Sequence, residues 1–177
     1  IIIYIVKLRE AALQKRQAEL EKTVTERTQE VVEKANEINH QKELIEEKQK
    51  EIVDSIKYAQ RIQKALLASK NILESNLRDY FIFFNPKDLV SGDFYWATEV
   101  NNKFYFIVAD STGHGVPGAF MSLLNISYLN EAINERGIEK PGDILNYVRQ
   151  RLITSLSDDG SEEGGKDGMD CSLLCFD

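Results

Sequence analysis

The chain has 177 residues, of which 42% are hydrophobic and 29% charged, and its formal net charge is −7. This size suits one modest domain together with an extended element. The acidic balance argues against nucleic acid as a partner, because a phosphate backbone is bound by basic surface. Cys171 and Cys175 have even spacing in an apolar run. This spacing favours two small core side chains on one strand face over a disulfide or a metal site.

Residues 1–9 begin with six apolar side chains, and Lys7 and Arg9 follow. Six apolar residues cannot cross a bilayer, which takes about 20. The pattern nevertheless resembles the cytoplasmic end of a longer transmembrane helix. We therefore expect residues 1–9 to be the stub of such a helix, at the cell membrane, with the rest of the chain in the cytoplasm. The alternative is a loose hydrophobic end that packs on another surface.

Residues 10–75 are predicted to form a linker, because residues 10–69 contain neither Pro nor Gly and so favour one long helix. Aliphatic residues recur every seven positions, at Val24, Val31, Ile38, Ile45, Ile52, Ala59 and Leu66. This is one half of a coiled-coil seam. The other half is mostly polar and includes Gln49 and Gln63. We expect a marginally stable parallel homodimer, as a signalling linker needs; a rigid spacer is the alternative. Near residues 55–67 the apolar face widens, so the helix should pack there on a folded body and couple the linker to it.

After Asn76 the pattern changes to aromatic residues with a period of two, and residues 80–84 are predicted to form a strand. Residues 103–110 are apolar at odd and even positions, which predicts a strand buried on both faces. Another β-rich run begins near residue 90, and Asn101 and Asn102 between the two runs indicate a tight turn. The two strands are therefore predicted to form an antiparallel hairpin.

The predicted hairpin places two carboxylates side by side. Asp93 lies near the start of its first strand and Asp110 at the end of its second, and these ends are neighbours in an antiparallel pair. Two such carboxylates repel each other unless a proton or a cation lies between them. Mg²⁺ and Mn²⁺ prefer oxygen ligands of this kind. The sequence therefore predicts a divalent metal site at this end of the sheet.

The C-terminal half predicts a tight glycine-rich loop at 113–118, a buried helix at 117–135 that ends before Gly137, and a second helix at 141–156. The loop is not a nucleotide phosphate loop, because Ala119 and Phe120 stand where Lys and Ser or Thr are required. Residues 157–168 are predicted to be an acidic, solvated loop, and residues 169–176 a further strand.

Two motifs in the expected order carry a resemblance, NPKDLVSGDFYW at 85–96 and ADSTGHGVPGA at 109–119. They resemble the metal-dependent serine/threonine phosphatases of the stage II sporulation protein E type, in the PPM class, over roughly residues 55–177. The resemblance implies an α+β fold in which a long N-terminal coiled-coil helix precedes an incomplete antiparallel β-sandwich with flanking helices. Residues 76–177 would be the N-terminal part of this phosphatase domain. It also implies hydrolysis of a phosphoserine or phosphothreonine in a protein, by water activated between two Mn²⁺ or Mg²⁺ ions.

On this resemblance, Asp93, Asp110 and the backbone carbonyl of Ser111 would be metal ligands. Lys87 could hold the substrate phosphate as a point charge, or it could be an ordinary surface lysine. His114 could donate a proton to the leaving seryl oxygen. In related eukaryotic enzymes a histidine follows the metal-binding aspartate more closely, so a purely structural role of His114 in the loop is the alternative.

Members of this family continue with further strands and metal-binding aspartates that have no counterpart here, so we expect a truncated domain that binds metal weakly. Asp170 would approach the metals without being a direct ligand. The resemblance implies a membrane-bound signalling protein with a cytoplasmic catalytic domain, controlled by its coiled coil. Its substrate would be a phosphorylated regulatory protein, typically an anti-sigma-factor antagonist. The alternative is a non-catalytic dimerisation and signal-relay module with a degenerate or incomplete phosphatase fold.

Overall fold

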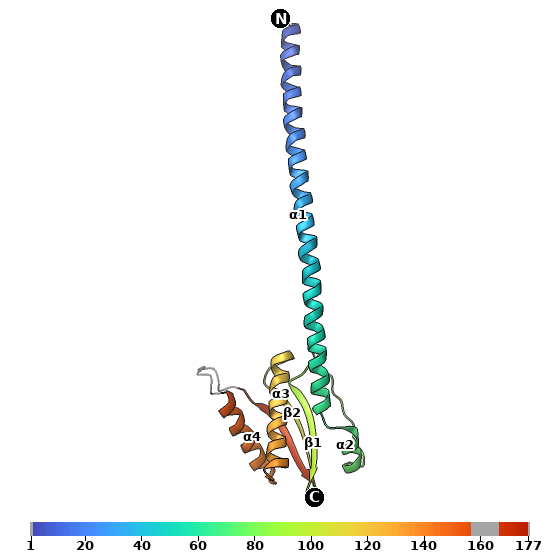
Figure 1. Cartoon of the computed structure of the whole chain (residues 1–177), viewed down its shortest axis with the longest axis vertical. Helices are drawn as coiled ribbons and strands as arrows, with labels where there is room; N and C mark the ends of the chain where they lie inside the picture. Colours follow the sequence, from blue (N-terminus) through green and yellow to red (C-terminus); the bar gives the residue numbers. More distant parts are fainter. Residues whose placement is uncertain (1, 157–166, 177) are drawn as a thin grey trace. The chain divides into compact units, whose positions relative to one another are not determined.

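The computed structural model describes residues 2–156 and 167–176. Its elements, in chain order, are helices α1 (Ile2–Leu66) and α2 (Lys70–Asn76), strands β1 (Asp93–Val100) and β2 (Lys103–Ser111), helix α3 (Gly115–Asn130) with a π-helical continuation η1 (Glu131–Glu135), helix α4 (Pro141–Leu156) and strand β3 (Met169–Phe176) (Figure 1). The chain divides into two compact units, Ile1–Ile52 and Val53–Asp177. The α+β class is confirmed. The predicted division into a membrane stub (1–9), a linker (10–75) and a phosphatase domain (76–177) stays a prediction.

The first unit is the N-terminal part of α1, so the long helix expected from residue 10 onward is confirmed. Its charged side chains pair along the helix, as Lys34 does with Glu30. The aliphatic heptad residues are 60–64% exposed at Val24, Val31, Ile38, Ile45 and Ile52. The coiled coil itself stays a prediction. Within the described ranges 2–156 and 167–176, no helix is both long enough and apolar enough to span a membrane.

The second unit is built on an antiparallel sheet with the strand order β1-β2-β3. Asn101 and Asn102 join β1 to β2 and have φ angles of 53° and 62°. Positive φ at both central residues is typical of the two-residue turn whose twist matches a β-hairpin. The predicted hairpin is therefore confirmed, as is the predicted strand at Met169–Phe176.

One face of the sheet carries the main core, which α3, η1 and α4 cover (Figure 1). Alternate strand residues such as Tyr105 and Ile107 are fully buried there with Leu129 and Val148. The helix predicted at 141–156 has the observed bounds. The helix predicted at 117–135 begins two residues earlier, at Gly115, and its last turn is π-helical.

The two cysteines are confirmed as small core residues. Cys171 and Cys175 are free thiols, partly buried against the core face. Burial, together with the nearby Asp170 carboxylate, raises the pKa of the Cys171 thiol. The acidic loop predicted at residues 157–168 stays a prediction, because residues 157–166 lie outside the described part of the chain.

The opposite face of the sheet is covered less completely. Ala68, in the connection between α1 and α2, and Leu73 of α2 pack there against Ala97 and Phe104. Farther along β2, Val108 is 46% exposed. The prediction that residues 103–110 are buried on both faces is therefore wrong for this part of the strand, because described residues cover only one of its faces.

The strand predicted at residues 80–84 is also wrong. The segment has no regular secondary structure and pairs with none of the three described strands. Phe81 and Phe83 are 90% and 86% exposed, whereas Phe84 packs edge-on against Tyr95 with 5.6 Å between ring centroids. The exposure of the side chains does alternate along the segment, as the sequence predicted. A strand, however, also needs a neighbouring strand for its backbone hydrogen bonds.

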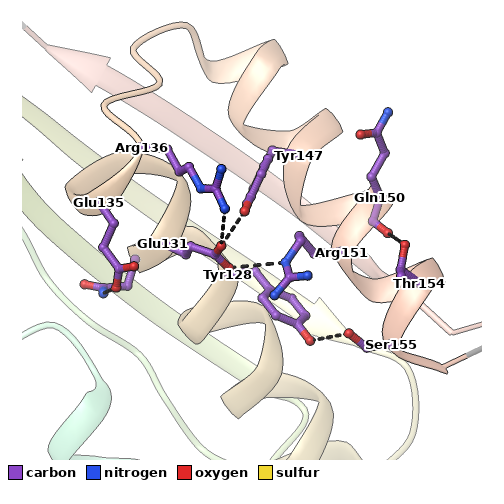
Figure 2. Close-up of polar contacts among 10 residues, drawn as sticks. Tyr128, Glu131, Glu135, Arg136, Tyr147, Gln150, Arg151, Thr154 and Ser155 are labelled. Carbon is purple, nitrogen blue, oxygen red and sulfur yellow. Dashed lines mark hydrogen bonds and ion pairs between the residues drawn. The ribbon is translucent and has the colours of Figure 1, made fainter. Parts of the chain in front are cut away.

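A cluster of hydrogen bonds and ion pairs connects η1 to α4 (Figure 2). The Glu131 carboxylate accepts hydrogen bonds from the Tyr147 hydroxyl, from Arg151 at 3.2 Å and from Arg136 at 3.3 Å. The Arg151 guanidinium also lies 5.1 Å from the centroid of the Tyr128 ring. The Tyr147 hydrogen bond and the two arginines lower the pKa of Glu131 below its ordinary value. The cluster therefore stabilises the folded state more strongly when Glu131 is ionised.

Replacing Glu131 with Gln should make the second unit less sensitive to acid. The folded pKa of Glu131 is lower than its ordinary value of 4.5, so its contribution to stability is present above that value and is lost as the pH falls through the folded pKa. Between these two pKa values the unfolded state binds up to about one more proton at Glu131 than the folded state does. Glu131→Gln should abolish this difference. Urea unfolding between about pH 6 and about pH 3 measures this difference. The control is Glu135→Gln in the same turn, and an equal change in both variants would contradict the prediction.

Candidate functional site

The antiparallel register brings Asp93 and Asp110 together as predicted. Asp93 is the first residue of β1, and its Cα partner across the strand pair is Asp110, next to the last residue of β2. Both side chains are on the sheet face that α3 and α4 do not cover, because their neighbours Phe94 and Ala109 are in the core. Both line an open cavity of about 690 Å³.

The two carboxylates interact unfavourably when both are charged. Partial burial raises the pKa of Asp93, and the adjacent Asp110 raises it further through its hydrogen bond and its negative charge. A proton shared between the carboxylates relieves this repulsion, and so would a bound cation. Their oxygen atoms are of the type that Mg²⁺ and Mn²⁺ prefer, so the donor chemistry fits a hard divalent ion.

Backbone packing places Ser111 directly against the turn that precedes Asp93. A Cβ atom on Gly92 would lie 2.7 Å from the carbonyl oxygens of Ser111 and Gly113, which is closer than real Cβ contacts allow. The Ser111 amide donates a hydrogen bond to the Gly92 carbonyl at 3.2 Å. Only glycine fits at position 92, and this close approach keeps the Ser111 backbone near both carboxylates.

Asp170 lies beside this pair, in agreement with the expectation that it approaches the metal site. It is the Cα partner of Asp110 across β2 and β3, and it lines the same cavity. Three aspartates therefore occupy one row across the end of the sheet, at Asp93, Asp110 and Asp170. Within residues 2–156 and 167–176, however, no group of three or more His, Cys, Asp or Glu side chains is arranged to hold a metal ion. The described residues thus supply a partial set of ligands.

The two predicted catalytic residues line the same cavity, Lys87 on one loop and His114 at the N-cap of α3. His114 is 79% exposed, and its Nδ1 lies 3.4 Å from a carboxylate oxygen of Asp88. The sequence reasoning missed Asp88, although its position directly after Lys87 in the first motif was a signal. The catalytic and structural readings of His114 and Lys87 both stay open.

A buried polar residue beneath the site was also missed. Asn125 of α3 is fully buried and donates a hydrogen bond to the Ser111 hydroxyl at 3.0 Å. Its Oδ1 atom has no hydrogen-bond partner among the described residues. Ser122, one turn earlier on α3, is also fully buried. Two polar residues three positions apart on the apolar face of this helix were the available signal.

Replacing Asp93 with Asn should stabilise the metal-free protein at neutral pH. Because the folded pKa of Asp93 is raised, wild-type stability falls as the pH rises from the unfolded pKa through the folded pKa. The amide cannot ionise, so this fall should disappear and the Tm near pH 7 should rise. Thermal unfolding in a chelator, with Asp79→Asn in an exposed loop as control, measures the change. An unchanged or lower Tm for Asp93→Asn would contradict the repulsion.

No protein-family model and no curated protein matches this chain. Among solved structures, the chain is similar to the SiaA-PP2C domain of Pseudomonas aeruginosa, with 35% sequence identity and a TM-score of 0.60. The match covers 71% of this chain and 48% of the other, so the chain spans about half the length of the protein it matches. This likeness, together with the antiparallel sheet and its flanking helices, shows that the chain has a PP2C-like phosphatase fold.

Proposed function

We propose that this chain is part of a metal-dependent protein serine/threonine phosphatase of the stage II sporulation protein E type. The observation that supports this proposal most directly is the pairing of Asp93 with Asp110 at one end of the sheet. In a PP2C-like fold, such a pair beside an open cavity is suited to binding divalent ions.

The proposed roles are those that the resemblance implies, and the positions of Asp93, Asp110, Lys87 and His114 around one cavity support them. Asp93, Asp110 and the carbonyl oxygen of Ser111 would hold Mn²⁺ or Mg²⁺. When bound, these ions would supply Lewis-acid activation of water and neutralise charge on the phosphoryl group. Lys87 would bind the substrate phosphate as a point charge. His114, oriented by Asp88, would give a proton to the seryl or threonyl oxygen as its bond to phosphorus breaks.

The proposed substrate is a phosphorylated regulatory protein, with an anti-sigma-factor antagonist as the candidate that the resemblance implies. The cavity is wide and open to the surface, which suits a phosphorylated segment of a folded protein. Dimerisation through α1 belongs to the same proposal. Membrane attachment at residues 1–9, with a cytoplasmic catalytic domain, stays a prediction from the sequence.

We expect Mn²⁺-dependent hydrolysis of p-nitrophenyl phosphate by the protein at its natural length. Asp110→Asn should lower kcat/KM by at least about 100-fold, because it removes a charge that would hold the metal and stabilise the transition state. His114→Asn should lower kcat by about 100-fold with a phosphoserine peptide, whose alkoxide leaving group needs a proton, and much less with p-nitrophenyl phosphate, whose phenolate leaves without one. Steady-state kinetics over a range of Mn²⁺ concentrations measures both effects.

The control for these variants is Asp79→Asn, which changes an exposed carboxylate outside the cavity. Hydrolysis that survives in Asp110→Asn would contradict the proposed metal site. A folded dimer at natural length without hydrolysis at any Mn²⁺ or Mg²⁺ concentration would favour the non-catalytic relay module instead.

The proposed dimer depends on the exposed aliphatic stripe of the first unit. Replacing Ile38 and Ile45 with Asp should convert the dimer to monomer, because like charges would face each other across the seam. Sedimentation equilibrium measures the change. The control carries Asn39→Asp and Glu46→Gln, at two positions that are not on the heptad stripe. Dimerisation that persists unchanged in the Ile38 and Ile45 variant would show that this stripe is not the interface.

A further inference from the structure

Asn125, in the middle of α3, is a buried polar residue without a role in the chemistry proposed above. Its side chain is fully buried, although asparagine is mostly found at protein surfaces. Nδ2 donates a hydrogen bond to the Ser111 hydroxyl, while Oδ1 has no partner among the described residues. A buried amide that is only half satisfied lowers the stability of a fold. Packing alone therefore does not explain an asparagine at this position.

Helix α3 lies very close to the backbone of the site. A Cβ atom on Gly118 would lie 2.5 Å from the Gly113 carbonyl oxygen and 3.1 Å from the Gly92 Cα atom, so only glycine allows this approach. Gly118, Ser122 and Asn125 are spaced by four and three residues, and all three are buried. They therefore share one face of α3, and this face contacts the backbone beside the ends of β1 and β2.

The contact with Asn125 anchors Ser111 on the side of the sheet away from the two carboxylates. In β2 the side chains of Ala109 and Ser111 are buried, whereas Asp110 between them is exposed on the opposite face. The Ser111 amide is anchored separately, because it donates a hydrogen bond to the Gly92 carbonyl at 3.2 Å. The two anchors together limit the direction of the Ser111 carbonyl group, which is the proposed metal ligand.

We propose that Asn125 is a positioning residue that orients the Ser111 carbonyl group by holding the Ser111 side chain. The proposal rests on the proposed function for its metal, but not for the contacts that carry it. Loss of the Asn125 amide leaves the Ser111 hydroxyl without its donor, and the backbone at the end of β2 loses one of its anchors. Groups that orient metal ligands typically change metal affinity by about 10–100-fold when they are removed.

The test separates stability from metal affinity with three variants of the 177-residue chain. Asn125→Leu keeps the branched shape of the side chain without its hydrogen bonds, and so leaves the buried Ser111 hydroxyl unpaired. Ser111→Ala removes this hydroxyl and keeps the backbone carbonyl group. The double variant removes both polar partners, so its stability should exceed that of each single variant. Thermal unfolding measures the stability, and titration calorimetry measures the affinity for Mn²⁺.

We expect the double variant, like each single variant, to bind Mn²⁺ about tenfold or more weakly than the wild-type chain does. If Asn125 only supported the fold, Mn²⁺ affinity would recover together with stability in the double variant, and this recovery would overturn the proposal. Unchanged Mn²⁺ affinity in Asn125→Leu would also overturn it.

The control is Tyr128→Phe, which removes the hydrogen bond between Tyr128 and Ser155 from the same helix. Tyr128 does not line the cavity that contains Asp93 and Asp110, so this variant should keep the wild-type affinity for Mn²⁺. A weakening in Tyr128→Phe as large as that in Asn125→Leu would show a general effect of α3 and would overturn the proposal.

Hydrogen exchange of the Ser111 amide in the metal-free chain separates this inference from the proposed function. If the wild-type chain and the protein at natural length bind no Mn²⁺, the proposed metal site fails. The exchange rate, measured by NMR, then decides the role of Asn125 by itself, because it requires no metal. Faster exchange in Asn125→Leu and in the double variant than in Tyr128→Phe supports the positioning role, and equal exchange overturns it.

Discussion

The antiparallel register of β1 and β2, which pairs Asp93 with Asp110, is the constraint on which the rest of the second unit depends. Two carboxylates in register repel each other, and partial burial raises the pKa of Asp93 as well. Such a pair persists only where the surrounding backbone holds it. Here that support comes from the two-residue turn at Asn101 and Asn102, which determines the register, and from the core face of the same two strands.

The backbone around the carboxylates is held by close packing and by buried polar groups. Gly92 fits against the carbonyl oxygens of Ser111 and Gly113 because it has no side chain. Beneath it, Gln63 and Asn125 hydrogen-bond to Ser91 and Ser111, the residues that adjoin the two strand ends. A buried amide specifies one arrangement when its hydrogen bonds are satisfied, as they are at Gln63. Asn125 uses its amide nitrogen on Ser111, while its Oδ1 has no partner among the described residues. The rigid part of the site is therefore the backbone, while the residues that would contact substrate lie on exposed loops.

The two units differ in what stabilises them. The second unit has a hydrophobic core on one sheet face and a smaller cluster on the other. The first unit is a helix whose aliphatic stripe is exposed, supported by charged pairs along its surface. An isolated helix gains little from such pairs. The argument for a partner on that stripe is therefore its exposed apolar surface. This argument is independent of the one for a phosphatase site.

Local patterns in the sequence were enough to determine the long helix, the hairpin with its Asn-Asn turn, the helix at Pro141–Leu156 and the neighbouring positions of Asp93 and Asp110. These features depend on period, turn chemistry and antiparallel geometry, which are encoded within short stretches of chain. Only the tertiary structure decided that residues 80–84 pair with no described strand and that Val108 is exposed. It also decided that Gln63 is buried against Ser91, because strand neighbours, coverage of a sheet face and contacts between residues 28 positions apart depend on how distant segments pack.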